Sequence, residues 1–189
     1  MTAQRKKMQK IKQAKQQTAG SKVANRMGDS EPMAYKPGAL VLRLVAMSKS
    51  IPMASKEVNR LAANPFGDRL LLALAAEEGA PGVLVTSLEE SIFYTKGDLA
   101  HAMGVSTKSV ERYARAERLA PTQTERLLQL DEVVFEGVKT FESETKFYRW
   151  LTTPSAALGG ATPKSLLTTS YGVELVLGEL NAIEYGIFA

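Results

Sequence analysis

The segment between Thr95 and Arg118 carries the side chains whose types and spacing indicate a definite chemistry. Near the start of a short predicted helix, polar and charged residues would be exposed and could reach base edges: Ser106, Thr107, Lys108, Glu111 and Arg112. An arginine in such a position can bind guanine through two hydrogen bonds. Arg115 and Arg118 follow and are expected to contact phosphates. The pattern predicts a surface that binds DNA.

Two short helices joined by a tight turn would position these side chains. Thr95 and Asp98 resemble a capping box at the start of the first helix, and Ser106 is expected to cap the second. Ala100 is small enough for the helices to cross, and Gly104 tolerates the positive φ of a turn. The second helix would pack on the first through Val105, Val110 and Tyr113.

This spacing predicts a helix-turn-helix, but its charge leaves the function open. Residues 95–126 contain six basic and four acidic residues, a weak positive balance for a DNA-binding unit. A helical hairpin that serves only packing or dimerisation is the alternative interpretation. His101 is interpreted as a surface residue or one that contacts backbone, because no carboxylate pair accompanies it.

The sequence offers little for catalysis or metal binding. It has no cysteine and one histidine, which excludes thiolate chemistry, disulfides and a histidine-rich metal site. No motif pairs two carboxylates, and the double glycine at 159–160 is too short to cradle a phosphate. We therefore expect no enzyme activity, no catalytic residue, no metal and no cofactor.

The composition indicates a globular protein in the cytoplasm. The chain has 189 residues, 44% of them hydrophobic, which suffices for one ordinary domain or two small ones. The longest apolar run, residues 39–47, is interrupted by Arg43 and is far shorter than a membrane span. The basic start of the chain lacks the apolar segment of a signal peptide.

The net charge of +4 is concentrated at the N-terminus. Residues 1–26 carry eight lysines and arginines and no acid, whereas the remaining chain has 16 bases and 20 acids. Residues 1–36 contain too few large apolar groups to offset the entropy of ordering, so we expect a basic tail. It is either a solvated, flexible segment or an arm that contacts phosphates without sequence specificity.

Helical periodicity continues through residues 37–141. In the region 37–79, Asp68 is expected to cap a helix that ends at Gly79. The apolar residues of this helix form a stripe that is expected to pack into the core: Leu70, Leu71, Leu74 and Ala75. Pro81 suits the first position of the next helix. Thr122 and Glu125 are predicted to form a capping box on a long helix that joins residues 80–130 to the C-terminal unit.

Residues 131–189 predict a small acidic helical unit, with eight acids and four bases. Ser143 is expected to cap a helix that Pro154 ends, and Thr162 a later one that begins at Pro163. The last helix would place these apolar residues on one side: Val173, Val176, Leu177, Leu180 and Ile183. Trp150, Tyr171 and Leu180 are expected in the core. The acidic balance suits a basic protein partner better than DNA.

The chain resembles the Xre/MbcA/ParS family of type II antitoxins over residues 70–189. The C-terminal pattern that carries the resemblance combines Phe141, Trp150-Leu151, Pro154, Leu158-Gly159-Gly160, Thr162-Pro163, Leu166-Leu167, Thr169, Gly172 and Ile183-Glu184-Tyr185-Gly186. The region from Leu99 to Leu127 resembles the Xre-type helix-turn-helix of the same family. The resemblance implies an all-α fold with an Xre-like helix-turn-helix domain (80–130) joined to a small helical toxin-binding domain (131–189).

The resemblance also implies partners. Family antitoxins neutralise a RES-domain toxin that consumes NAD, by NAD degradation or ADP-ribosylation, and cover its NAD cleft with the C-terminal domain. Trp150, Gly159, Gly160 and Pro163 would shape that domain. The residues expected to face the toxin are Glu184, Tyr185, Ile187, Phe188 and Ala189. A homodimer within a toxin–antitoxin hetero-oligomer would bind operator DNA and repress the operon.

Two positions depart from the family pattern. Residues 106–109 read Ser-Thr-Lys-Ser where the family commonly has Ser-x-Arg-Thr, so the base preference stays open. Lys164 is charged where the family usually has an apolar residue after Thr-Pro. The alternative function is a stand-alone dimeric helix-turn-helix regulator whose C-terminal unit only dimerises.

Overall fold

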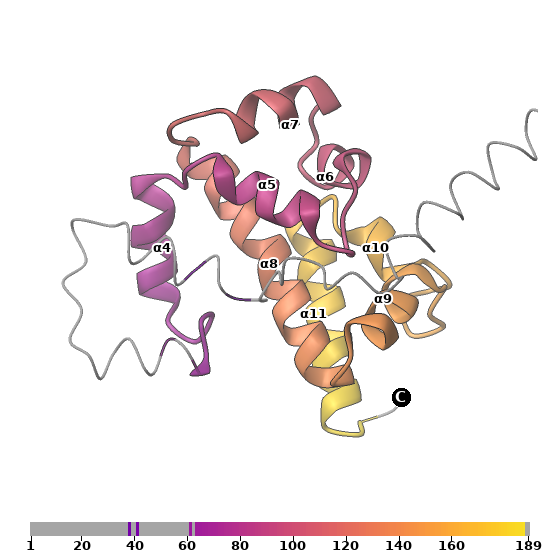
Figure 1. The fold of residues 1–189 in the computed structure, drawn as a ribbon. Coiled ribbons are helices and arrows are strands. Elements are labelled where there is room, and N and C mark those ends of the chain that lie inside the picture. The colour runs from indigo at the N-terminus through magenta and orange to yellow at the C-terminus, as the bar shows by residue number, and fades with distance from the viewer. Residues whose placement is uncertain (1–37, 39–40, 42–60, 62, 188–189) are drawn as a thin grey trace, which may run out of the picture. The chain divides into compact units, whose positions relative to one another are not determined.

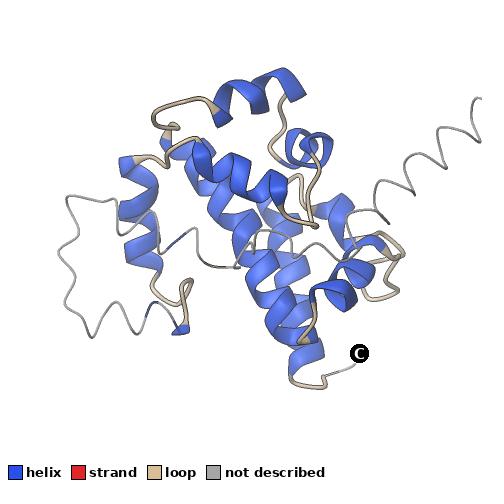
Figure 2. Cartoon of the chain, in the orientation of Figure 1, coloured by secondary structure: helices blue, strands red, loops and turns tan. Residues whose placement is uncertain are grey.

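A computed structural model describes Gly38, Val41, Leu61 and residues 63–187 of the chain, all of them in the compact unit Tyr35–Ala189. The predictions for the tail 1–36 and for most of residues 37–62 lie outside the described residues. Within the described part, all regular secondary structure is helical, as predicted (Figures 1 and 2).

The described helices follow one another with short connections. Their bounds are α4 Arg69–Glu78, α5 Val83–Glu90, α6 Lys96–Ala102, α7 Thr107–Ala114, α8 Pro121–Phe141, α9 Glu144–Thr152, α10 Pro163–Leu166 and α11 Ser170–Glu184. The boundary expected between residues 130 and 131 falls inside α8, which runs without a break from the first half of the fold into the second. None of the described helices is by itself long and apolar enough to cross a membrane; the pair α4 and α5 reaches that length only with a bend of 119°.

The long helix α8 lies at the centre of the fold, with α4, α9 and α11 packed against it (Figure 1). Its fully buried apolar residues include Leu127, Leu130, Val133 and Val134. Burying these side chains contributes about 1.5–3 kcal/mol each. One consequence is that the second half of the protein has no separate core, because a single buried cluster joins residues from α4 to α11.

Helix α11 runs beside α8 in the same direction. Arg126 near the start of α8 donates to the carbonyl of Leu167, just before α11. At the other end, Lys139 lies 3.1 Å from Glu184. Gly172 and Val173 face inward, and the backbone at Gly172 approaches Leu166 so closely that a Cβ would clash with its carbonyl.

Helix α4 begins as predicted but buries a different stripe. The Asp68 carboxylate accepts from the Leu71 amide, and Gly79 with φ 81° ends the helix. The buried residues are Leu71, Leu72, Ala75 and Ala76. Leu70 and Leu74 are 71% and 48% exposed, so placing them in the core was wrong. The face of α4 that contacts α8 lies between the row of Leu71 and Ala75 and the row of Leu72 and Ala76. Leu70 and Leu74 lie on the other side of the helix and point away from α8.

The starts of α5 and α8 also differ from prediction. Helix α5 begins at Val83, so Pro81 precedes its first turn. Helix α8 begins at Pro121 after Ala120, and no side chain caps it, so the box of Thr122 and Glu125 does not form. Proline suits that first position because it lacks the amide hydrogen that a cap would satisfy.

The aromatic cluster between α8 and α9 depends on a glycine. Phe147 is buried against Gly137, where a Cβ would collide with the ring. Phe141 and Trp150 extend the cluster, with their ring centroids 6.2 and 6.1 Å from that of Phe147. Trp150 is only partly buried, at the edge of the core.

Leu180 is buried as expected, but Tyr171 is not. Leu180 is 1% exposed, whereas Tyr171 is 81% exposed and the core assignment for it was wrong. On α11 the inward face is set by Val173, Val176 and Leu180. Tyr171 lies on the opposite side of the helix from this row.

Candidate functional site

The turn between α6 and α7 has the predicted local structure. Thr95 and Asp98 form a capping box on α6, and the Ser106 hydroxyl accepts from the Ser109 amide at the start of α7. Gly104 has φ 64°, and the next amide, that of Val105, donates to the Ala100 carbonyl over 2.9 Å. These contacts fix the angle at which α7 leaves α6.

All six predicted DNA-contacting residues are exposed on or next to α7: Ser106, Thr107, Lys108, Glu111, Arg112 and Arg115. The inward side of α7 is held by Val110, which is fully buried. The residues therefore share one accessible helix surface, as a DNA-reading helix requires.

Besides Ser106, which caps α7, two charged residues of the six have partners within the chain. Glu111 accepts from Lys96 over 3.0 Å, and Lys96 also lies 3.6 Å from Glu89. The hydrogen bond with Glu111 raises the pKa of Lys96, and the same bond lowers the pKa of Glu111. The guanidinium of Arg112 lies over the ring of Tyr113, 5.5 Å from its centroid. Both contacts are at the surface and can exchange for a ligand.

Arg118 has a structural role that the sequence did not reveal. Its guanidinium donates to the carbonyls of Glu78 and Gly79 over 3.0 and 2.9 Å. Those carbonyls end α4, so Arg118 caps that helix from 39 residues away. The expected phosphate contact would have to compete with this arrangement.

Arg126 was not anticipated as a key residue either. It lies on α8 and donates to the Ala102 carbonyl over 2.9 Å, to Gln129 over 2.7 Å and to the Leu167 carbonyl. Burial lowers its pKa. One guanidinium thereby joins the end of α6 to the segment before α11, a link that no sequence spacing indicates.

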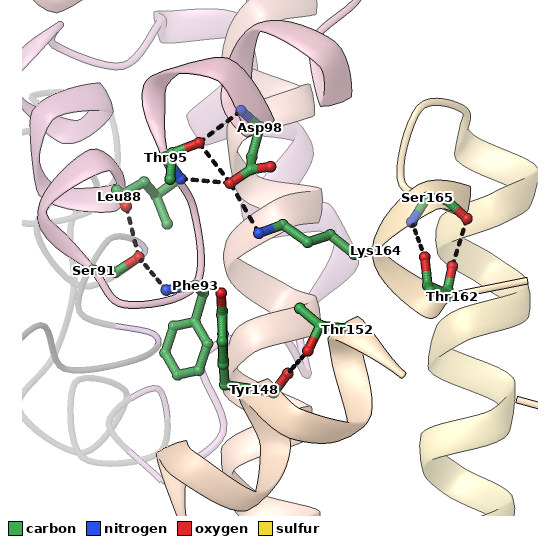
Figure 3. A network of polar contacts seen from close by, with 10 residues as sticks. All are labelled: Leu88, Ser91, Phe93, Thr95, Asp98, Tyr148, Thr152, Thr162, Lys164 and Ser165. Atoms are coloured by element: carbon green, nitrogen blue, oxygen red, sulfur yellow. Dashed lines mark hydrogen bonds and ion pairs between the residues drawn. The ribbon is translucent and has the colours of Figure 1, made fainter. Parts of the chain in front are cut away.

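Lys164 makes a second connection between α6 and the C-terminal helices. Its ammonium is 2.8 Å from Asp98 and lies over the ring of Tyr148, 5.6 Å from the centroid (Figure 3). Asp98 is the same carboxylate that accepts from the amide and hydroxyl of Thr95. The departure from the family pattern at residue 164 thus has a partner in this chain.

The C-terminal end of α11 is exposed, and its residues differ in their contacts. Tyr185 and Ile187 are 73% and 67% exposed. The Glu184 carboxylate pairs with Lys139, which also lies 3.2 Å from Glu136. The hydrogen bond that Lys139 donates to the Glu184 carboxylate raises the pKa of Lys139. Phe188 and Ala189 lie outside the described residues.

The four residues expected to shape the C-terminal unit play different parts. Gly159 and Gly160 have φ 66° and 82° in an exposed turn, so glycine is needed there for its backbone angles rather than for space. Pro163 is buried at the first position of α10, after the Thr162 cap. Trp150 stacks on the aromatic cluster.

Two grooves lie between helices of the described part. One of about 320 Å³ lies between α4 and α8 beside the pair Arg69–Glu132, whose atoms are 2.6 Å apart. Another, of about 290 Å³, lies between α6, α8 and the start of α11. Among the described residues no group of three acidic, histidine or cysteine side chains could hold a metal ion.

The chain is similar to known antitoxins. Residues 136–186 match the family model described as the antitoxin Xre/MbcA/ParS C-terminal toxin-binding domain. The chain is 27% identical over 112 residues to "Antitoxin Xre" of Photorhabdus laumondii, covering 58% of this chain and 76% of that protein. It is 29% identical over 96 residues to "Antitoxin Xre" of Yersinia enterocolitica, covering 50% and 65% respectively. The chain is thus similar to antitoxins of the Xre/MbcA/ParS family, most clearly in its C-terminal segment.

Proposed function

We propose that this protein neutralises a RES-domain toxin that consumes NAD, and that it represses the promoter of the toxin–antitoxin operon. The proposal assigns the C-terminal half to the toxin and the α6–α7 unit to DNA. The observation that carries it is the exposed, aromatic end of α11 within a segment that matches a toxin-binding domain.

The chemistry of that end suits a cleft that holds NAD phosphates. Such a cleft must contain basic side chains, and the carboxylate of Glu184 is a charged partner for an arginine. Glu184 is bound to Lys139 at the surface, so a toxin arginine would replace one ion pair by another with bidentate geometry. Tyr185 and Ile187 would add apolar contact around it.

Co-expression tests the first part of the proposal. The product of the adjacent reading frame is expressed alone and with this chain, and growth and the cellular NAD pool are measured. When the product of the adjacent reading frame is expressed alone, we expect growth arrest and loss of NAD. When this chain is co-expressed, growth and the NAD pool should recover, and the two proteins should co-purify. If the product of the adjacent reading frame leaves growth and NAD unchanged, or does not co-purify with this chain, the proposal that this chain neutralises an NAD-consuming toxin is wrong.

The DNA-binding part is supported by the accessible surface of α7. A homodimer would present two such helices to two half-sites of an operator, which matches the symmetry of most helix-turn-helix proteins. A footprint on the DNA upstream of the operon should appear with the purified protein and weaken with Arg112→Ala. A footprint without any toxin partner nearby would favour the stand-alone regulator instead.

A further inference from the structure

The outward face of α11 carries an apolar stripe that the C-terminal end alone does not explain. Five residues follow one another at intervals of four, three, four and three, which places them on one side of a helix: Tyr171, Leu175, Gly178, Ala182 and Tyr185. The exposed fractions of the three large ones are 81% for Tyr171, 59% for Leu175 and 73% for Tyr185. The opposite side of the same helix is the one that packs on α8.

The stripe has small residues at its centre and tyrosines at its ends. Its centre is small, because Gly178 has no atom within 4 Å of where a Cβ would stand and Ala182 is only half-buried. Its ends are tyrosines, which offer a large apolar body and a polar tip and are enriched among the residues that dominate binding energy. A ridge of side chains from another helix would fit between the two rings.

Acidic residues border the stripe on both sides. The helical angle places Glu174 along one edge and Glu179 along the other. Neither carboxylate has an ion pair within the part of the chain that the structure describes. The face therefore fits an apolar helix that has lysine or arginine beside its apolar residues.

We infer that this face of α11, and not only its C-terminal end, is where a basic-flanked helix of the toxin docks. This inference rests on the function proposed above. All of the stripe lies inside residues 136–186, which match a toxin-binding domain, and it ends at Tyr185, two residues before the exposed Ile187.

A second copy of the chain is a poorer occupant of the same face. In a symmetric pair of α11 helices, antiparallel packing brings the two Glu174 edges to the same side of the interface. Parallel packing brings the Glu174 edge of one helix beside the Glu179 edge of the other. Either arrangement brings acidic edges together and is opposed by charge repulsion.

Binding measurements with charge-inserting variants test the inference. The full chain and the purified product of the adjacent reading frame are titrated by calorimetry, using wild type, Leu175→Arg and Gly178→Arg. Leu70→Arg on α4 is the matched control, since it makes the same change at a residue that is 71% exposed and on another helix. Urea unfolding of each variant shows whether its stability is kept.

We expect both α11 variants to bind at least about tenfold more weakly, as when a charge enters the apolar centre of an interface, and the control to bind like wild type. If wild type binds and both α11 variants bind equally well, the inference is wrong while the proposed function stands. If the wild-type protein does not bind the product of the adjacent reading frame, both the inference and the proposed function fail. If Leu175→Arg instead dissolves a homodimer and leaves toxin binding unchanged, the face joins two copies and the inference is also wrong.

Discussion

Lys164 and Asp98 lie 66 residues apart in the chain, yet their charged atoms are 2.8 Å from each other. The carboxylate of Asp98 also completes the capping box of α6 with Thr95. The lysine at the start of α10 is therefore bound to the residue that fixes the start of the candidate DNA-reading unit (Figure 3). Together with Arg126, it joins the segment that matches a toxin-binding domain directly to α6.

Replacing Lys164 by Met should destabilise the protein in a pH-dependent way. Burial by itself would raise the pKa of Asp98, but hydrogen bonds from Lys164 and Thr95 outweigh it and leave the pKa lowered. Because the pKa of Asp98 is lower in the folded protein than in the unfolded chain, the ionised carboxylate stabilises the fold. This stabilisation is complete above the pKa of the unfolded chain and is lost as the pH falls through the pKa of the folded protein. Urea unfolding at pH 7 should show a loss of about 1 kcal/mol, and the difference from wild type should shrink toward pH 3.

Lys146→Met is the control for this change, because the lysine is exposed on α9 and makes no ion pair within the described residues. Its free energy of unfolding should match that of wild type at both pH values. A loss for Lys164→Met that is the same at pH 3 and pH 7 would show that packing on Tyr148, and not the charge pair, accounts for the effect.

Arg126→Met should cost more, about 3 kcal/mol. The change removes the donors to the Ala102 and Leu167 carbonyls and leaves partly buried acceptors without them. Arg126→Lys should recover less than half of the loss, because an ammonium cannot reproduce the planar fork that spans both carbonyls. Thermal and urea unfolding measure both variants. Full recovery by lysine would contradict the bridging role.

Alanine at two helical glycines should have opposite effects on stability. At Gly137 the new Cβ would meet the Phe147 ring, so overpacking of about 1–3 kcal/mol should outweigh the better helix propensity. At Gly178 there is open space, and Gly178→Ala should stabilise by about 0.5–1 kcal/mol. Urea midpoints of the two variants give the comparison. A stabilised Gly137→Ala protein would mean that α9 can move away from α8.

Two arginines near α7 should affect DNA binding differently if the operator proposal holds. Arg115 is exposed beyond the end of α7, so Arg115→Ala should weaken binding equally for all sequences and lower the salt slope by about one. Arg112→Ala should instead relax the preference at one base pair, at a cost of about 1–3 kcal/mol. Competition binding at several salt concentrations separates them. Identical salt slopes for wild type and Arg115→Ala would show that Arg115 does not contact a phosphate.

The local signals in the sequence determined much of the secondary structure. Ser, Thr and Asp caps, a proline at a first helical position and glycines at turns act within a few residues, so the sequence shows them directly. The caps at Asp68, Thr95, Ser106, Ser143 and Thr162 and the turns at Gly104 and 159–160 all formed as predicted. The all-α fold followed from the same signals.

Only the tertiary structure decided which faces are buried and which distant residues meet. Leu70, Leu74 and Tyr171 look like core residues in isolation, but the angle at which α8 meets α4 and α11 leaves them exposed. Arg118, Arg126 and Lys164 bind backbone carbonyls or a carboxylate 24 to 66 residues away, and no periodicity encodes such pairs. Side-chain burial depends on how whole helices pack, and that is a property of the folded chain rather than of any local segment.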